Sequence, residues 1–375
     1  MNKEQKDLLS ILRCALWQDE KIALSIKNIC WDKVFQLAKE QCLVGIIADS
    51  FQILNNKQID KNNKLKWLGY IVKLEQKNSS LNKLVYNLFL KFQNMQLSPI
   101  LMKGLAFAEN YPYPLHRQCG DIDIYFRNRE DCNKAVEWAA NIDRIAAKSC
   151  ANKRERKHFT FSIHGNIVEL HYFMCLFENS RLHKRLQQII DEEFADNEPS
   201  FVCIEEKQIE TVPYTLSVLH QIIHISRHLL EAGIGLRQIC DLALYLDKYY
   251  DVIDKEKLNV YLNDLQLMTV AKSIGYILVN FLGLKNEKMP FTIDKQYSEF
   301  IIREIFEGGN FGKKNITYRE NSQGLRRKVI SIFYFYKRCK KYQPLMPLEA
   351  KSYFLKKIIL NIRLITKHNY LFENE

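Results

Sequence analysis

The first hundred residues repeat hydrophobic positions at intervals of three and four, which places them on one face of an α-helix. Pro99 follows the last of these positions, and proline ends a helix. We therefore predict a helical region over residues 1–97 that supports the rest of the chain and holds no catalytic cluster. The repeating apolar positions are Val34, Leu37, Ala38, Leu81, Leu84, Val85, Leu88, Phe89 and Phe92.

The pattern changes after Pro99 to one of short strands. Residues 99–108 read as a strand, a Lys-Gly turn and a helix, and Ile122 and Ile124 alternate with two aspartates at the period of a strand. A helix is expected over 130–147. Two apolar segments, 159–163 and 167–172, flank His164-Gly-Asn166 and predict a hairpin.

Helical periodicity returns near residue 210, where a capping threonine and an early proline begin a helix at 211–215. The chain is therefore predicted to be an α+β protein with a small mixed sheet between helical regions. We expect an N-terminal helical region at 1–97, a core at 98–205, and a C-terminal helical domain with a basic tail at 206–375.

Asp121 and Asp123 are two residues apart in the predicted strand, so their carboxylates lie on one face while Ile122 and Ile124 enter the core. Glu169, in the second strand of the hairpin, can bring a third carboxylate beside them. Clustered carboxylates repel one another unless a cation lies between them. Mg²⁺, or Mn²⁺ in its place, suits such oxygen ligands and serves phosphoryl or nucleotidyl transfer.

Three further residues of this region are candidates for contact with a nucleotide or its phosphates. Lys103 and Gly104 form the strand-to-helix turn, where backbone N–H groups can approach a phosphate. His171 shares a strand face with Glu169 and has two possible roles, contact with a nucleotide or orientation of a carboxylate. Residues 148–158 are rich in lysine and arginine, which fits either a solvated loop or a rim that holds a triphosphate or an acidic acceptor.

Three histidines, His220, His224 and His228, recur every fourth residue and form one stripe on a helix. We interpret this stripe mainly as the lining of a cleft or as polar packing. Zinc binding is the lesser alternative, because the histidines do not form a His-Glu-x-x-His motif and the spacing places no acidic ligand beside them. Arg237 and Asp241 are also four residues apart, which favours an ion pair within the next helix, with Arg237 reaching into the cleft as the alternative.

The order of these motifs resembles a known family. A strand, Lys-Gly and a helix are followed by Tyr-Pro, an arginine, Gly-Asp-Ile-Asp-Ile and Val-Glu-Leu-His, as in the bacterial uncharacterised nucleotidyltransferase family of the DNA polymerase beta-like nucleotidyltransferase superfamily. The resemblance extends over roughly residues 30–250 and also implies a polymerase beta-like core. An arginine recurs in the family near Arg117, which would orient a phosphate, brace Asp121 or form a structural ion pair within its own loop. Gly104-Leu105 stands where the superfamily usually has Gly-Ser.

Charge adds one feature to this picture. The net charge is +12, and residues 301–375 carry 16 basic against 6 acidic residues, whereas residues 101–300 carry 24 against 28. The basic segments 326–328 and 337–341 flank an aromatic centre, which fits polynucleotide binding, a membrane surface or a packed helix with solvated lysines. No apolar run is long enough to span a membrane and no signal peptide is apparent, so we expect a cytoplasmic protein whose ten scattered cysteines are reduced.

The residues and the resemblance together predict a metal-dependent nucleotidyltransferase that moves a nucleoside monophosphate from a nucleoside triphosphate such as ATP to an acceptor hydroxyl. Asp121, Asp123 and Glu169 would hold the metal, and Lys103, Gly104, Arg117 and His171 would serve nucleotide binding. The acceptor is open between a small molecule and RNA or protein, as in toxin-like nucleotidyltransferases. The non-enzymatic alternative is a catalytically inactive nucleotide-binding module, which the absence of the turn serine favours.

Overall fold

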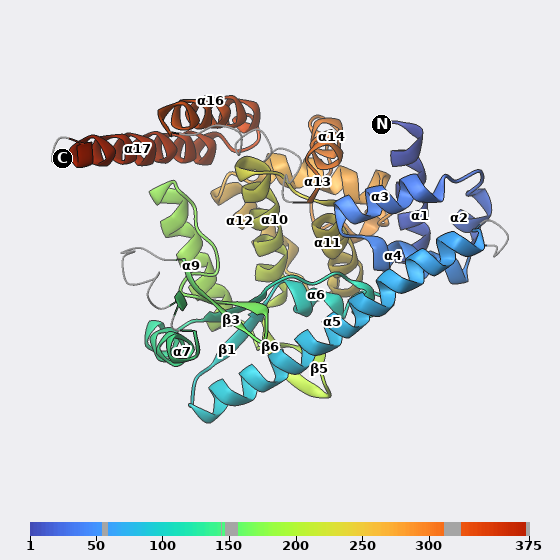
Figure 1. Cartoon of the computed structure of the whole chain (residues 1–375), viewed down its shortest axis with the longest axis horizontal. Coiled ribbons are helices and arrows are strands. Elements are labelled where there is room, and N and C mark those ends of the chain that lie inside the picture. Colours follow the sequence, from blue (N-terminus) through green and yellow to red (C-terminus); the bar gives the residue numbers. More distant parts are fainter. Residues whose placement is uncertain (55–58, 144, 147–156, 311–323, 373–375) are drawn as a thin grey trace.

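The computed structural model describes residues 1–54, 59–143, 145–146, 157–310 and 324–372 (Figure 1). It has the α+β architecture predicted from the sequence. The strands of a mixed sheet are preceded and followed along the chain by helical regions. The N-terminal helices are α1 (Lys3–Trp17), α2 (Glu20–Ser25), α3 (Trp31–Gln41), α4 (Val44–Ala48), the short η1 (Asp49–Gln52) and the long α5 (Lys61–Asn94).

The sheet has six strands in the described part of the chain, in the order β3-β4-β2-β1-β6-β5. β2 is antiparallel to β1 and parallel to β4, while β3–β4 and β5–β6 are antiparallel hairpins. The strands are β1 (Pro99–Met102), β2 (Ile122–Phe126), β3 (His158–Ile163), β4 (Asn166–His171), β5 (Ser200–Ile204) and β6 (Lys207–Thr211). Between them lie α6 (Gly104–Ala108), η3 (Pro114–His116), α7 (Arg129–Ile142) and α9 (Ser180–Asp196).

The two faces of the sheet have different environments. One face packs against α7 and the C-terminal half of α5, and Ile122 and Ile124 enter this core as predicted. The alternate residues of β2 and β4, among them Asp123 and Glu169, lie on the other face, which is turned to α6, α10 and α11. This second face therefore carries the polar side chains of interest.

Helices from both ends of the chain share a second hydrophobic core. Gln41 of α3 links them, because its side chain donates to the carbonyl of Ile305 and accepts from the amide of Leu236. The C-terminal helices are α10 (Tyr214–Glu231), α11 (Leu236–Tyr249), α12 (Lys255–Asp264), α13 (Met268–Asn280), the short η4 (Asn286–Lys288), α14 (Ser298–Gly308), α16 (Gly324–Tyr342) and α17 (Pro347–Phe372).

β6 pairs with β1 at the register Leu101–Thr211, so the last strand of the sheet runs to Thr211 and residue 205 lies in the turn of the β5–β6 hairpin. α7 ends at Ile142 rather than 147. The core of the N-terminal helices is continuous with that of the C-terminal helices.

The basic tail forms two helices, α16 and α17, that pair with each other. Phe335 and Arg338 of α16 are buried, and the Arg338 guanidinium donates to the carbonyls of Leu229 and Leu230 on α10. Phe333 and Tyr336 are exposed. The aromatic centre between the two basic segments is thus partly packed against the body of the protein. No helix in the described ranges combines the length and apolar character needed to cross a membrane.

Candidate active site

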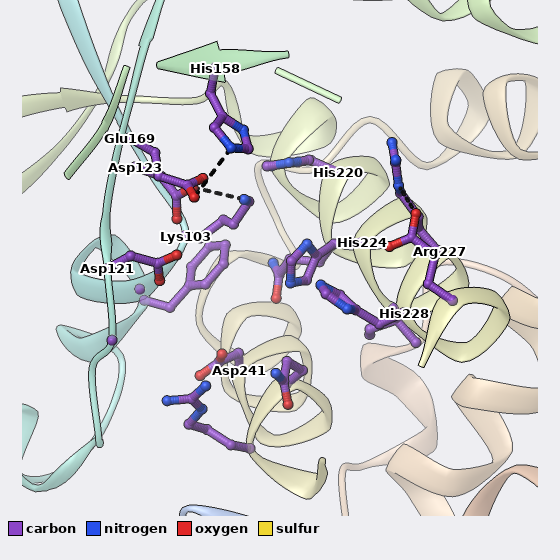
Figure 2. Close-up of a pocket in the computed structure, with 18 of the residues that line it drawn as sticks. Lys103, Asp121, Asp123, His158, Glu169, His220, His224, Arg227, His228 and Asp241 are labelled. Atoms are coloured by element: carbon purple, nitrogen blue, oxygen red, sulfur yellow. Dashed lines mark hydrogen bonds and ion pairs between the residues drawn. The ribbon is translucent and has the colours of Figure 1, made fainter. Parts of the chain in front are cut away.

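Three carboxylates meet on the polar face of the sheet, as the alternation of Asp and Ile predicts. Asp123 on β2 lies directly opposite Glu169 on the parallel strand β4, and Asp121 immediately precedes β2. Carboxylate oxygens of Asp121, Asp123 and Glu169 lie within 4.8 Å of one another (Figure 2). The predicted acidic cluster therefore exists as a spatial group.

The turn between β1 and α6 lies beside this cluster. Lys103 and Gly104 both have positive φ values, 50° and 35°, and the ψ of −151° at Lys103 places it in a region almost restricted to glycine, which is strained for lysine. The Lys103 ammonium lies 3.0 Å from Oδ1 of Asp123. A Cβ at Gly104 would lie 3.5 Å from the carbonyl oxygen of Asp121. The strained turn thus brings the backbone at Gly104 and the Lys103 side chain to the two aspartates.

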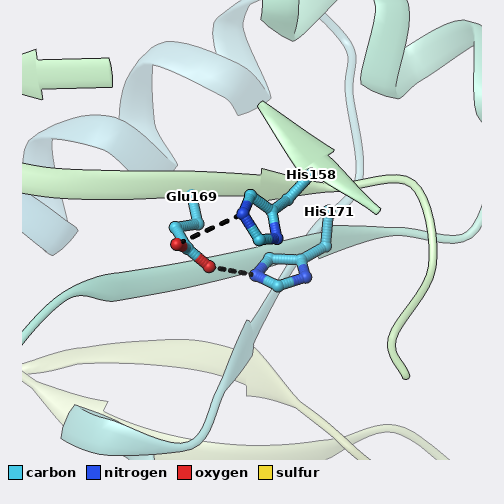
Figure 3. A group of neighbouring side chains, drawn as sticks. All are labelled: His158, Glu169 and His171. Carbon is cyan, nitrogen blue, oxygen red and sulfur yellow. Dashed lines mark ion pairs between the residues drawn. The ribbon is translucent and has the colours of Figure 1, made fainter. Parts of the chain in front are cut away.

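His171 lies beneath the carboxylates and is fully buried. Its Nε2 is 2.8 Å from Oδ1 of Asp123 and 3.2 Å from Oε2 of Glu169, while Nε2 of His158 is 3.4 Å from Oε1 of Glu169 (Figure 3). His171 is not among the residues that line the adjoining cavity. Of its two predicted roles, the structure favours orientation of carboxylates over direct contact with a nucleotide.

The carboxylates differ in their protonation behaviour. Burial and repulsion by Asp123 and Glu169 raise the pKa of Asp121. Burial also opposes ionisation of Asp123, but the Lys103 charge and the hydrogen bond from His171 outweigh it and hold the pKa of Asp123 well below its usual range. Burial likewise opposes ionisation of Glu169, whose pKa is nevertheless lowered by the His171 hydrogen bond. Among the described residues, only the Lys103 charge opposes this shift at Asp121, and it does not outweigh burial and the repulsion by the other two carboxylates.

The donor chemistry of this group fits a hard divalent cation. All three side chains offer carboxylate oxygens, the ligands that Mg²⁺ and Mn²⁺ prefer. A cation would relieve the repulsion that raises the pKa of Asp121. A second group, His158, Glu169 and His171, also brings ligand atoms within 4.8 Å. In that group Nε2 of His171 is already bound to Asp123, so the all-oxygen group is the better cation site.

A cavity of about 320 Å³ separates the carboxylates from α10 and α11 (Figure 2). His220, His224 and His228 line its far wall, so the stripe has the cleft-lining position that we predicted. Burial lowers the pKa of each of the three, to about 3 at His228, which leaves them uncharged near neutral pH. The stripe is not part of either metal-compatible group found in the described residues, which does not favour zinc.

Arg117 lines the cavity and is paired with Asp241 of α11. Its Nε donates to Oδ1 at 2.8 Å and its Nη2 to Oδ2 at 2.6 Å, and both side chains are buried. The ion pair predicted between Arg237 and Asp241 is therefore wrong, because Arg237 instead donates to the carbonyl of Gln118. Of the roles open for Arg117, the structure favours the structural ion pair, although with a helix distant in sequence.

Lys157 and His158, at the start of β3, also line the cavity. No acidic side chain in the described ranges forms an ion pair with Lys157, which lies near Lys103 and Arg227. Burial and repulsion by these two cations lower the pKa of Lys157 to about 8. Both residues belong to the segment 148–158 that we considered as a rim of the active site. The rest of that segment, 148–156, lies outside the described part of the structure. Nothing in the local sequence distinguished Lys157 from its basic neighbours.

A family model described as an uncharacterised nucleotidyltransferase matches residues 27–283, well over half of the chain. Among solved structures, the crystal structure of an antigenic nucleotidyltransferase-like protein from Paracoccidioides brasiliensis matches with 14% sequence identity and a TM-score of 0.28, covering 51% of this chain and 86% of that one. No curated protein gives a significant match. On the extent of the family match, the chain belongs to the uncharacterised nucleotidyltransferase family.

Proposed function

We propose that the protein is a metal-dependent nucleotidyltransferase of the DNA polymerase beta-like superfamily, which moves a nucleoside monophosphate from a nucleoside triphosphate to an acceptor hydroxyl. The observation that carries this proposal is the convergence of Asp121, Asp123 and Glu169 beside the Lys103-Gly104 turn in one cavity. Family membership supports the same chemistry.

Asp121, Asp123 and Glu169 would hold the metal. When bound, Mg²⁺ or Mn²⁺ supplies positive charge to the phosphates and lowers the pKa of a hydroxyl. Lys103 keeps Asp123 ionised and His171 fixes the orientation of Asp123 and Glu169. These contacts make the ligand set available before substrate arrives, which is what preorganisation requires.

Two groups would bind the triphosphate. The backbone N–H groups at Gly104 begin α6 beside the carboxylates. Lys157 supplies an ammonium that, unlike Lys103, forms no ion pair with an acid in the described ranges. In the reaction, a bond forms between the acceptor oxygen and the α-phosphorus while the bond to pyrophosphate breaks. The products are the acceptor joined through its oxygen to the nucleoside monophosphate, pyrophosphate, and the proton released from the acceptor hydroxyl.

A transfer screen tests this function. Purified protein, Mg²⁺ or Mn²⁺ and each α-labelled nucleoside triphosphate are incubated with the small-molecule, RNA and protein fractions of a cell extract. We expect the wild type to label one fraction and Asp123→Asn to lose the label, while Glu206→Gln, an exposed residue of the β5–β6 turn, retains it. Full transfer by Asp123→Asn would refute the proposal. The labelled fraction identifies the acceptor class and so separates a small-molecule enzyme from a toxin-like enzyme.

Binding without transfer would favour the inactive nucleotide-binding module. The replacement of the usual turn serine by Leu105 is the observation on its side. One observation speaks against it. Three carboxylates are held close together over a buried histidine, and such a cluster lowers stability although binding of a nucleotide alone does not require it.

A further inference from the structure

Most of the basic side chains that line the cavity form an ion pair with an acid of the same lining. Three such pairs occur among the described residues: Lys103 with Asp123, Arg117 with Asp241, and Arg227 with Glu231. Two basic side chains of the lining, Lys157 and Arg237, have no acidic partner in the described ranges. The proposed reaction uses Lys157 to bind the triphosphate and leaves Arg237 without a role.

Arg237 lies in the first turn of α11, and only 8% of its surface is exposed. Its Nη1 donates to the carbonyl of Gln118, in the loop that precedes Asp121. Its Nε is buried without a hydrogen-bond partner among the described residues. Its Nη2 has no partner there either but is not one of the buried atoms, so this nitrogen is the part of the guanidinium that stays accessible beside the cavity.

A guanidinium is charged at every pH at which proteins are folded. Burial of such a charge lowers stability unless an opposite charge and hydrogen bonds compensate for it. The carbonyl of Gln118 supplies one hydrogen bond to Arg237, and no acid of the described residues supplies the opposite charge. The accessible Nη2 therefore indicates an anionic ligand in the cavity.

The position of Arg237 separates it from the expected triphosphate. Lys157 immediately precedes His158, and Arg237 is one helical turn from Asp241. Figure 2 shows His158 and Asp241 on opposite sides of the cavity, with the carboxylates of the proposed metal site between them. In nucleotidyl transfer the attacking oxygen approaches in line with the leaving pyrophosphate and from the opposite side. With the triphosphate beside Lys157, the acceptor occupies the side of Arg237.

We propose that Arg237 binds an anionic group of the acceptor, a phosphate or a carboxylate, and that the acceptor is a small hydroxyl compound with a negative charge. The N–H groups of Nη2 would form charge-assisted hydrogen bonds to the oxyanion. A neutral or cationic acceptor would leave the buried guanidinium unpaired. A polynucleotide is bound through a groove of basic groups that follows its backbone, whereas Arg237 is a single buried cation. This inference rests on the proposed function and specifies its acceptor.

Transfer to separated acceptor fractions tests the inference. The small molecules of a cell extract are divided by ion exchange into anionic, neutral and cationic fractions, and the RNA and protein fractions are kept beside them. Each is incubated with the protein, Mg²⁺ and α-labelled nucleoside triphosphates. We expect the wild type to label the anionic small-molecule fraction. Treatment of that fraction with a phosphatase, removed before the assay, abolishes labelling if the group is a phosphate monoester and preserves it if the group is a carboxylate.

A substitution of the arginine tests its part in this selection. Arg237→Gln should raise the apparent KM for the anionic fraction by about tenfold or more and leave kcat at saturation close to the wild-type value. Calorimetric binding of inorganic triphosphate with Mg²⁺ should stay unchanged, which also shows that loss of the bond to Gln118 leaves the metal site intact. Arg237→Lys keeps a charge and should recover part of the affinity. Arg181→Gln, at an exposed position of α9 outside the cavity, is the matched control.

Several outcomes would overturn the inference while the proposed function stands. They are labelling of the neutral, cationic, RNA or protein fraction in place of the anionic one, or an unchanged KM in Arg237→Gln. Weaker binding of inorganic triphosphate by Arg237→Gln would assign the arginine to the donor and overturn it as well. If Arg237→Gln does not fold, the wild-type fractions and Arg237→Lys decide. Absence of label from every fraction would instead refute the proposed function.

Discussion

Arg117 and Asp241 form a buried, two-pronged ion pair that joins the loop before β2 to α11, with N···O distances of 2.8 and 2.6 Å. The hydroxyl of Tyr111 donates a third hydrogen bond to Oδ1 of Asp241 at 2.7 Å. The guanidinium and carboxylate planes fit each other in this arrangement, which is the strongest form of such a pair. The pair therefore fixes the loop that leads to Asp121 against the far wall of the cavity.

Removal of the carboxylate should cost considerable stability. Asp241→Asn leaves the Arg117 charge buried without an opposite charge, and we expect the free energy of unfolding to fall by about 3–5 kcal/mol. Tyr111→Phe removes only one hydrogen bond and should cost about 1 kcal/mol. Urea denaturation measures both. Asp247→Asn on the same helix is the control, and an equal loss in Asp247→Asn and Asp241→Asn would contradict the role of the pair.

The second prediction concerns His171 and its contacts with Asp123 and Glu169. His171→Phe keeps a ring in the buried site but removes the hydrogen bonds that orient the two carboxylates. Loss of a group that orients metal ligands typically costs 10–100-fold in metal affinity. We expect that loss for Mn²⁺ in a calorimetric titration. His164→Asn, in the β3–β4 turn, should bind Mn²⁺ as the wild type does, and an unaffected His171→Phe would show that the histidine is only packing.

The third prediction uses the lowered pKa of Lys157. Since this pKa is about 8, the ammonium is charged at pH 7 and loses its proton as the pH rises through 8. If it binds the triphosphate, nucleotide affinity should fall above pH 8 by up to about tenfold per pH unit. Lys157→Arg, which stays charged, should give a flat profile from pH 7 to 9, whereas Lys157→Met should bind weakly throughout. A wild-type profile that matches Lys157→Arg would exclude the role.

The local patterns of the sequence predicted the parts of the site that depend on neighbours in the chain. The alternation of Ile122 and Ile124 with two aspartates sufficed to place the carboxylates on one strand face, because strand periodicity is local. The hairpin that carries Glu169 and the histidine stripe of α10 followed from the same kind of pattern.

What depends on contacts across the chain was not accessible in this way. Arg237 and Asp241 do lie four residues apart on one helix, but Asp241 pairs with Arg117, which is 124 residues earlier in the chain. The strand β6 was missed as part of the sheet because its partner β1 lies a hundred residues upstream. Gln221 has no distinguishing neighbours in the sequence, and only the three-dimensional structure reveals that its amide has no hydrogen-bond partner among the described residues.

The last prediction concerns a histidine with two acidic neighbours outside the cavity. His116, in η3, contacts Oδ1 of Asp49 through Nδ1 and Oε1 of Glu75 through Nε2, the latter at 3.0 Å. Burial raises the pKa of Asp49 to about 6. Burial opposes the charge on His116, but its two hydrogen bonds to the acids outweigh this and raise the pKa of His116. η3 directly precedes Arg117, so this cluster holds the start of the loop that leads to the carboxylates.

Both shifts act in the same direction on stability. A raised pKa means that the folded protein holds its proton where the unfolded chain has released it, so stability falls as the pH rises through the folded-state pKa. For Asp49 this loss occurs between about pH 4 and 6, and for His116 it continues above pH 6.5. We expect the free energy of unfolding of the wild type to fall relative to Asp49→Asn by about 1–3 kcal/mol between pH 4 and 8. His164→Asn should follow the wild type in urea denaturation at each pH, and parallel curves for wild type and Asp49→Asn would show that the cluster does not couple to folding.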